Sequence, residues 1–223
     1  MSEVLKSLRG IPVALARGVV NLIGRAMTME PSPITPWSSM QWYNPPAAWQ
    51  NRGDRLWVKT GLKTDFWRTT HYGFIRDSGH CYYREVLGNF RARVCFSGQY
   101  QELYDQAGLM VRVSKTHWLK CGIEYVDGVQ YASAVVTRER SDWAVAPLAG
   151  QPDRVWFEVR RRNEAIAVLY SLDGDKFVLL RLTDFPEEPT AWVGPVCASP
   201  EREGFEVTFE SFTVELSTAP VVD

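Results

Sequence analysis

Charged and aromatic side chains alternate along residues 117–126 (HWLKCGIEYV) in a pattern that can support chemistry. Alternate residues of a strand lie on opposite faces, so Trp118, Lys120 and Glu124 are expected on one face. A lysine and a glutamate withdrawn from water can act as acid and base. The alternative is a solvent-exposed face on which a Lys–Glu ion pair contributes little to stability.

A second group of polar residues lies between positions 65 and 80, where Asp65, Arg68, His71, Asp77 and His80 occur. Two histidines and an aspartate would ligate a metal if they met, but their spacing is not a recognised ligand pattern. Ligand contacts and structural hydrogen bonds are the alternatives. We expect neither a metal nor another cofactor.

Two further positions offer contacts to a ligand. Asp105, between Tyr104 and Gln106, either orients a sugar hydroxyl or caps the strand that follows. Trp143 follows Asp142 in what reads as a loop tip. An exposed indole there favours stacking on a ligand or a partner.

The elements that must position these residues are strands. From residue 55 onward, short alternating or β-branched segments are separated by Gly, Asp and Asn turns, including the hairpin signals Asp127-Gly128 and Asp173-Gly174. No long segment after residue 36 has a helical period, so the pattern predicts an all-β sandwich or barrel. The expected strands are 55–60, 81–87, 90–97, 107–114, 117–126, 129–138, 154–162, 164–171, 176–182, 191–198 and 205–216.

Residues 1–27 form a different kind of segment. They carry four basic residues against one acidic residue, a local charge of +3, and their pattern predicts an amphipathic helix kinked at Pro12. Charges interrupt its apolar runs too often for a membrane span or a good secretory signal. This basic arm is expected to dock on its own domain or a partner, to contact a membrane surface, or to serve as an organelle presequence. Residues 28–36 read as a Pro-rich linker, and 217–223 as a tail.

Composition narrows the function classes. The chain has 223 residues, of which 45% are hydrophobic and 23% charged, as in globular proteins. A net charge of -1 argues against bulk nucleic-acid binding. The 4 cysteines show no CxxC spacing, which indicates reduced thiols rather than zinc ligands and fits a cytoplasmic protein, with an organelle such as the mitochondrion as the alternative. Five of the 9 tryptophans lie between residues 37 and 67, where we expect them to pack the N-terminal stretch onto the sheets.

Several blocks of the sequence resemble a known family. They are Asp65–Phe74 (DFWRTTHYGF), Tyr104–Leu109 (YDQAGL), Trp118–Tyr125 (WLKCGIEY) and Ser141–Trp143 (SDW). The family is the domain-of-unknown-function group typified by the regulation-of-enolase protein of yeast, within the concanavalin A-like lectin/glucanase superfamily. Tyr170–Gly174 (YSLDG) resembles a hairpin of related sandwich domains, including those appended to β-xylosidases.

The resemblance covers about residues 37–216 and implies a concanavalin A-like jelly-roll sandwich of two antiparallel sheets. It implies that carbohydrate binds on a concave face, and it implies no settled activity. We expect a lectin-like module for a carbohydrate or sugar phosphate, with a role in regulating carbohydrate metabolism. The alternatives are a carbohydrate-acting enzyme and a protein–protein interaction module. The candidate site residues are Trp67, Arg68, His71, Tyr72, Asp105, Lys120, Glu124 and Trp143.

Glucanases of that superfamily carry clustered carboxylates on one strand, because glycoside hydrolysis needs an acid and a base or nucleophile at fixed separation. The nearest series here is Glu206, Glu210 and Glu215, with Glu215 on the opposite parity. We interpret these as solvated strand residues. A standard retaining glucanase is therefore disfavoured, and a non-catalytic role is favoured over an enzymatic one.

Overall fold

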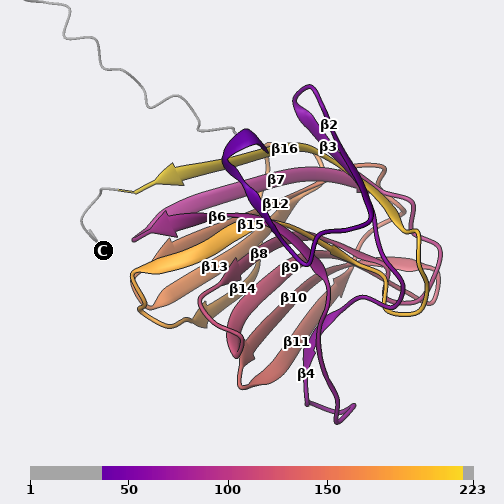
Figure 1. Ribbon diagram of the computed structural model, residues 1–223. Coiled ribbons are helices and arrows are strands. Elements are labelled where there is room, and N and C mark those ends of the chain that lie inside the picture. The colour runs from indigo at the N-terminus through magenta and orange to yellow at the C-terminus, as the bar shows by residue number, and fades with distance from the viewer. Residues whose placement is uncertain (1–36, 218–223) are drawn as a thin grey trace, which may run out of the picture. The chain divides into compact units, whose positions relative to one another are not determined.

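The computed structural model describes residues 37–217, which form two seven-stranded antiparallel sheets (Figure 1). The first sheet has the order β1-β6-β15-β8-β9-β10-β11, and the second has the order β14-β13-β12-β7-β16-β3-β2. A two-stranded sheet, β4-β5, is added to them. This all-β sandwich confirms the expected class and is consistent with a jelly roll.

A short 3-10 helix, η1, spans Trp37–Ser39. The strands are β1 Gln41–Tyr43, β2 Ala48–Arg52, β3 Arg55–Lys59, β4 Phe66–Arg68, β5 Ile75–Asp77, β6 His80–Leu87, β7 Phe90–Gly98, β8 Gln106–Arg112, β9 His117–Val126, β10 Val129–Arg138, β11 Arg140–Pro147, β12 Val155–Arg162, β13 Ala165–Ser171, β14 Val178–Asp184, β15 Thr190–Ala198 and β16 Glu206–Leu216. Every strand expected from the sequence is present, with ends shifted by at most a few residues.

The hairpin signals place the turns where they were expected. Asp127 and Gly128 join β9 to β10 with φ values of 49° and 84°, as a two-residue type I′ turn requires. Asp173-Gly174 lies in the connection between the paired strands β13 and β14. Positive φ at both turn residues explains why Asp-Gly is found at the first of these turns.

Five strands were not anticipated: β1, β2, β4, β5 and β11. The expectation that Trp143 sits at a loop tip is wrong, because β11 pairs with β10 from Arg140 to Pro147, with Trp143 opposite Val135. β11 ends its sheet and is exposed at irregular positions, so its sequence lacks the clean alternation of a half-buried strand. The four others are only three to five residues long.

The main core lies between the two large sheets. Leu119, Cys121 and Ile123 face it, while Trp118 belongs to a separate apolar cluster on the outer face of the first sheet, as the alternation of β9 predicted. The aromatic N-terminal stretch packs on the core as expected: Trp42 lies 4.7 Å from Tyr82 between ring centroids, and Trp37 stacks on the same ring at 6.3 Å.

The burial of Glu158 differs from the exposure expected at this position of β12. Strand alternation over residues 154–162 predicts that Val155, Phe157 and Val159 face the core and Glu158 faces water, yet the side chain of Glu158 is fully buried. Arg91 and Arg93 on β7 and Arg160 on β12 hold its carboxylate at 2.6 to 2.9 Å. Burial alone would raise the pKa of Glu158, but these hydrogen bonds outweigh it and lower the pKa. Alternation gives the face of a residue, and neighbouring long side chains decide how far water reaches it.

All four cysteines are free and buried. No helix within residues 37–217 is long and apolar enough to cross a membrane. The helix expected over 1–27, the linker 28–36 and residues 218–223 of the tail fall outside the described residues, and so those expectations remain predictions.

Candidate binding pocket

A hairpin lies across the outer face of the first sheet. Residues 66–77, which we call the flap, contain β4, β5 and the turn between them. Phe66, the first residue of the flap, is fully buried, with its ring centroid 6.3 Å from Tyr43 and 6.1 Å from Trp118. A Cβ on Gly79 would lie 2.3 Å from the Phe66 ring, so only glycine fits there. Packing of the Phe66 ring in this aromatic cluster therefore requires that the backbone at Gly79 lie close to it.

Polar contacts fix the flap at both of its sides. At the β1 side, Arg112 donates two hydrogen bonds to Asp77, at 2.6 and 2.9 Å, and the Tyr43 hydroxyl donates a third at 2.7 Å. At the β11 side, the Arg68 amide donates to Ser141 Oγ at 2.9 Å. Figure 1 shows β4 running beside β11. These contacts tie the two ends of the flap to the sheet.

Between the flap and β11 lies a pocket of about 540 Å³, including its open mouth. Five aromatic rings wall it: Trp67, Tyr72, Phe74, Tyr104 and Trp143. Asp65, Gln106, Lys120 and Glu124 form its base, and Arg76, Pro200 and Glu201 complete its rim. Aromatic walls around a few converging polar groups are the composition of a small-molecule site.

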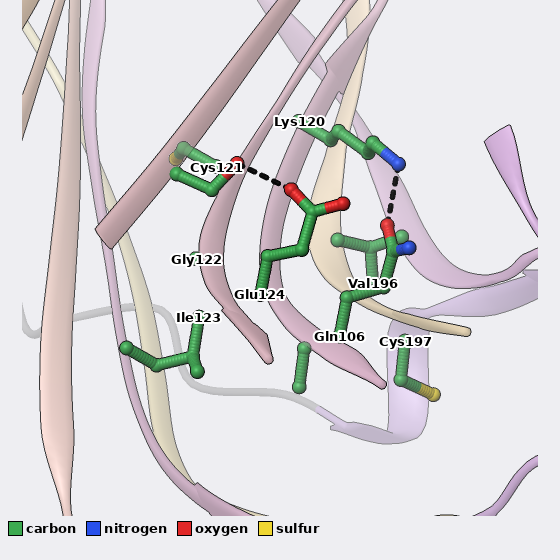
Figure 2. A pocket seen from close by; sticks show the side chains of 10 residues that line it. Gln106, Lys120, Cys121, Gly122, Ile123, Glu124, Val196 and Cys197 are labelled. Carbon is green, nitrogen blue, oxygen red and sulfur yellow. Dashed lines mark hydrogen bonds between the residues drawn. The ribbon is translucent and has the colours of Figure 1, made fainter. Parts of the chain in front are cut away.

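Two paired glycines form a bare strip of backbone at the base. Gly108 on β8 pairs with Gly122 on β9, and a Cβ on Gly122 would lie 2.0 Å from the Ala107 carbonyl oxygen. Lys120 and Glu124 flank this strip from the same strand, with Gln106 opposite Glu124. Figure 2 shows Lys120, Glu124 and Gln106 around a smaller adjoining pocket beside Gly122, which shares these three residues with the aromatic pocket. These glycines are required by the close approach of β8 and β9 between Lys120 and Glu124.

Lys120 is a buried cation with only 6% of its surface exposed. Its Nζ donates to Gln106 Oε1 and lies 3.4 Å from Asp65 Oδ1. The Gln106 amide donates in turn to the Tyr104 carbonyl at 3.1 Å. This arrangement orients the ammonium group at the base of the pocket and partly neutralises it.

Glu124 forms a second polar chain. It is 8% exposed and accepts a hydrogen bond from Ser133 Oγ at 2.8 Å, and Ser133 Oγ accepts one from the Trp143 indole at 3.0 Å. Burial raises the pKa of Glu124, and the charge of Lys120 and the Ser133 hydrogen bond oppose that shift. The Glu124 carboxyl can accept a hydrogen bond from a ligand hydroxyl when it is ionised, and it can donate one when it is protonated.

The mouth of the pocket is bridged by two tyrosines. The hydroxyls of Tyr72, in the flap, and Tyr104, before β8, lie 2.9 Å apart, and this hydrogen bond together with burial raises the pKa of Tyr104. The flap turn is strained, because Thr69 and His71 both have φ of 63°. Such strain persists only where surrounding contacts hold it, and it is common in ligand-binding turns.

Five of the eight predicted site residues line the pocket: Trp67, Tyr72, Lys120, Glu124 and Trp143. Arg68 instead contacts the Glu139 carbonyl at 3.1 Å at the edge of the sheet. Asp105 is fully buried and caps its turn by accepting from the amides of Gln101 and Glu102, at 3.0 and 3.1 Å. The capping alternative is therefore the one that applies to Asp105.

The two flap-region histidines have different surroundings. His71 is exposed and touches the edge of Tyr72 at 4.8 Å between centroids. His80 is buried: its Nε2 accepts from the Gly61 amide at 3.0 Å, and its Nδ1 lies 2.6 Å from the Asn44 carbonyl. Burial lowers the pKa of His80 and favours the neutral ring. Both nitrogens of His80 are thus used structurally.

Sequence reasoning missed several pocket residues. Gln106 is at the base only because β8 and β9 pair in the register that sets it opposite Glu124. Glu201 reaches the rim from the loop between β15 and β16, far along the chain. Asp65 and Tyr104 stood within the quoted sequence blocks, and Asp65 also belonged to the polar group at positions 65–80, but neither was among the candidate site residues.

The sequence profile of the family described as Protein of unknown function (DUF1349) matches residues 42–217. The chain belongs to this family. It is 40% identical over 193 residues to Regulation of enolase protein 1 of Saccharomyces cerevisiae, covering 86% of this chain and 96% of the relative. It is 28% identical over 172 residues to an uncharacterized protein of Emericella nidulans, covering 72% of this chain and 86% of that one.

Solved structures agree on the fold of this family member. A functionally unknown protein from Saccharomyces cerevisiae superposes with a TM-score of 0.80 and 39% identity, over 83% of this chain and all of that one (100%). The GH43 protein BlXynB mutant (K247S) from Bacillus licheniformis gives 0.65 at 16% identity, over 80% of this chain and 37% of the enzyme. Carbohydrate binding module CBM66 from Bacillus subtilis gives 0.52 at 9% identity, over 80% and 97%.

Proposed function

We propose that the chain is a lectin-like module that binds a saccharide in the pocket above Lys120 and Glu124. The observation that carries this proposal is the pairing of five aromatic walls with buried, oriented polar groups at the base. Sugar rings offer apolar faces for aromatic stacking and hydroxyls that both donate and accept hydrogen bonds. Lys120 can donate to such hydroxyls and Glu124 can accept from them.

The charges of the pocket favour a neutral sugar over a sugar phosphate. Asp65, Glu124 and Glu201 oppose Lys120 and Arg76, and Lys120 already contacts Asp65. A phosphate group would therefore meet little uncompensated positive charge, and its desolvation would cost more than that of a hydroxyl. Both ligand classes belong in the test.

The names of similar proteins support a role in carbohydrate biology. One structural neighbour is named a carbohydrate binding module, and the yeast relative is named for regulation of enolase. We extend these names to this chain only as a proposal that sugar binding serves the regulation of carbohydrate metabolism, in the cytoplasm. Docking of a protein partner is a further part of that proposal.

A glycan and sugar-phosphate screen on the full chain, followed by calorimetry of the ligands found, tests the proposal. Trp143→Ala and Lys120→Ala should each weaken binding about tenfold, since a stacked ring or a charged hydrogen bond contributes roughly 1–2 kcal/mol. Trp49→Ala is the matched control, because Trp49 is 38% exposed against 37% for Trp143 but lies outside the pocket. Equal affinities for all the variants would remove the pocket proposal.

An enzyme acting on carbohydrate is the second candidate. The specific observation in its favour is that Glu124, with its raised pKa, shares the base of the pocket with buried Lys120. Glu124→Gln would then abolish turnover of a bound sugar while retaining its binding. Chromatography of sugars incubated with the wild-type chain checks this, and unchanged sugars would leave the lectin-like role.

A further inference from the structure

The flap covers the middle of the face on which the pocket lies. Phe66 and Trp67 pack into an apolar cluster whose other buried members come from strands β6, β8, β9, β10 and β15. Those members are Cys81, Tyr83, Met110, Trp118, Val135 and Val196. A polysaccharide running along this face would have to displace the flap. The flap therefore interrupts this face of the sheet, which offers no continuous groove for a polysaccharide.

The side of the flap away from the pocket is also occupied. Arg112 is 3% exposed there, bound twice to Asp77 and lying 4.6 Å from the centroid of the Tyr43 ring. Breaking this partly buried ion pair would leave buried Arg112 without its counter-charge, so these contacts hold the flap in place. A sugar chain that left the pocket beneath the flap would meet this ion pair.

Other elements line the remaining sides of the pocket. Trp143 stands on β11, and Tyr104 meets Tyr72 across the mouth through the 2.9 Å hydroxyl contact. Pro200 and Glu201 lie on the last side. An internal sugar unit of a chain needs two exits, one for each neighbour, whereas a terminal unit needs one.

We infer that the pocket takes the free end of a glycan, or a free mono- or disaccharide, and excludes the interior of a polysaccharide. This inference rests on the proposed function and narrows its ligand class. Because the flap covers part of this face, the site suits the end of a glycan better than the interior of a polysaccharide.

Calorimetry with defined saccharides tests the inference. The probes are maltose, maltoheptaose and β-cyclodextrin, with xylose, xylobiose and xylohexaose as a second series, and the same length series of any other sugar found in the screen. Affinity per chain should change less than threefold between the short and long linear members. A cyclic glucan has no ends, so β-cyclodextrin should bind at least 100-fold more weakly than maltoheptaose if the glucan series binds.

The opposite results overturn the inference. They are a gain of tenfold or more with chain length, or binding of β-cyclodextrin as strong as that of maltoheptaose. Trp143→Ala should weaken the short and long members equally, with Trp49→Ala as the unaffected control. Long-chain binding that survives Trp143→Ala would reveal a surface for chain interiors and would also overturn it. Binding of no sugar at all would instead remove the proposed function itself, together with this inference.

Discussion

At the scale of single residues, Lys120 and Glu124 show how much a strand pattern can anticipate. Their spacing put both side chains on one face of β9, and the structure places both at the base of one pocket. Their partners come from other parts of the chain: Asp65 and Gln106 for Lys120, and Ser133 for Glu124. Those partners orient the polar groups that the pocket offers a ligand.

Glu124→Gln should change how stability depends on pH. Burial raises the pKa of Glu124 above its usual 4.5, so the folded state holds this proton more tightly than the unfolded state. The wild-type chain therefore loses stability relative to Glu124→Gln as the pH rises from 4.5 through the higher folded pKa. Urea denaturation of both proteins between pH 4 and 8 measures the difference, and parallel profiles would contradict the prediction.

At the scale of elements, the pocket depends on a close approach of strands. The Gly108–Gly122 pair removes side chains from the base, and Gly194 on β15 similarly sits against the Tyr82 carbonyl, where a Cβ would lie 1.9 Å from the oxygen. The flap then supplies one wall. Neither feature belongs to a single strand, since each needs two elements to meet at a set distance.

Gly122→Ala should destabilise the protein by about 2 kcal/mol or more, because its Cβ would lie 2.0 Å from backbone that cannot move without shifting a strand. Gly61→Ala is the matched control, since its Cβ would meet its nearest neighbour at an ordinary 3.6 Å. Chemical denaturation compares the two. Equal free energies of unfolding for the variants would show that the strands can separate at low cost.

At the scale of the whole molecule, the two large sheets bury a shared core, and the flap covers a second apolar cluster. All four thiols lie in strands and out of contact with solvent. Burial raises the pKa of Cys81 and of Cys95 to about 12, and it raises the pKa values of Cys121 and Cys197 as well. Thiolate, the reactive form, is therefore scarce at neutral pH.

Thiol labelling should report global unfolding of the sandwich. We expect no measurable reaction of the native protein with a thiol-exchange reagent at pH 7.5, and reaction of all four cysteines in concentrated guanidinium chloride. All four thiols are buried, so reagent access and ionisation require the fold to open: Cys121 and Cys197 lie in the core between the sheets, and Cys81 lies in the outer cluster with Phe66 and Trp67. Rapid labelling of any cysteine without denaturant would mean that part of the sandwich opens locally.

The sequence by itself determined the all-β class, the main strands, the faces of β9 and the family, because alternation, hairpin turns and sequence blocks are properties of neighbouring residues. Only the tertiary structure decided that Trp143 lies on an edge strand, that Asp105 caps a turn and that Glu158 is buried beneath three arginines. It also decided that the flap closes the pocket. These features depend on pairing register and on coverage by segments distant in the chain, which no local pattern encodes.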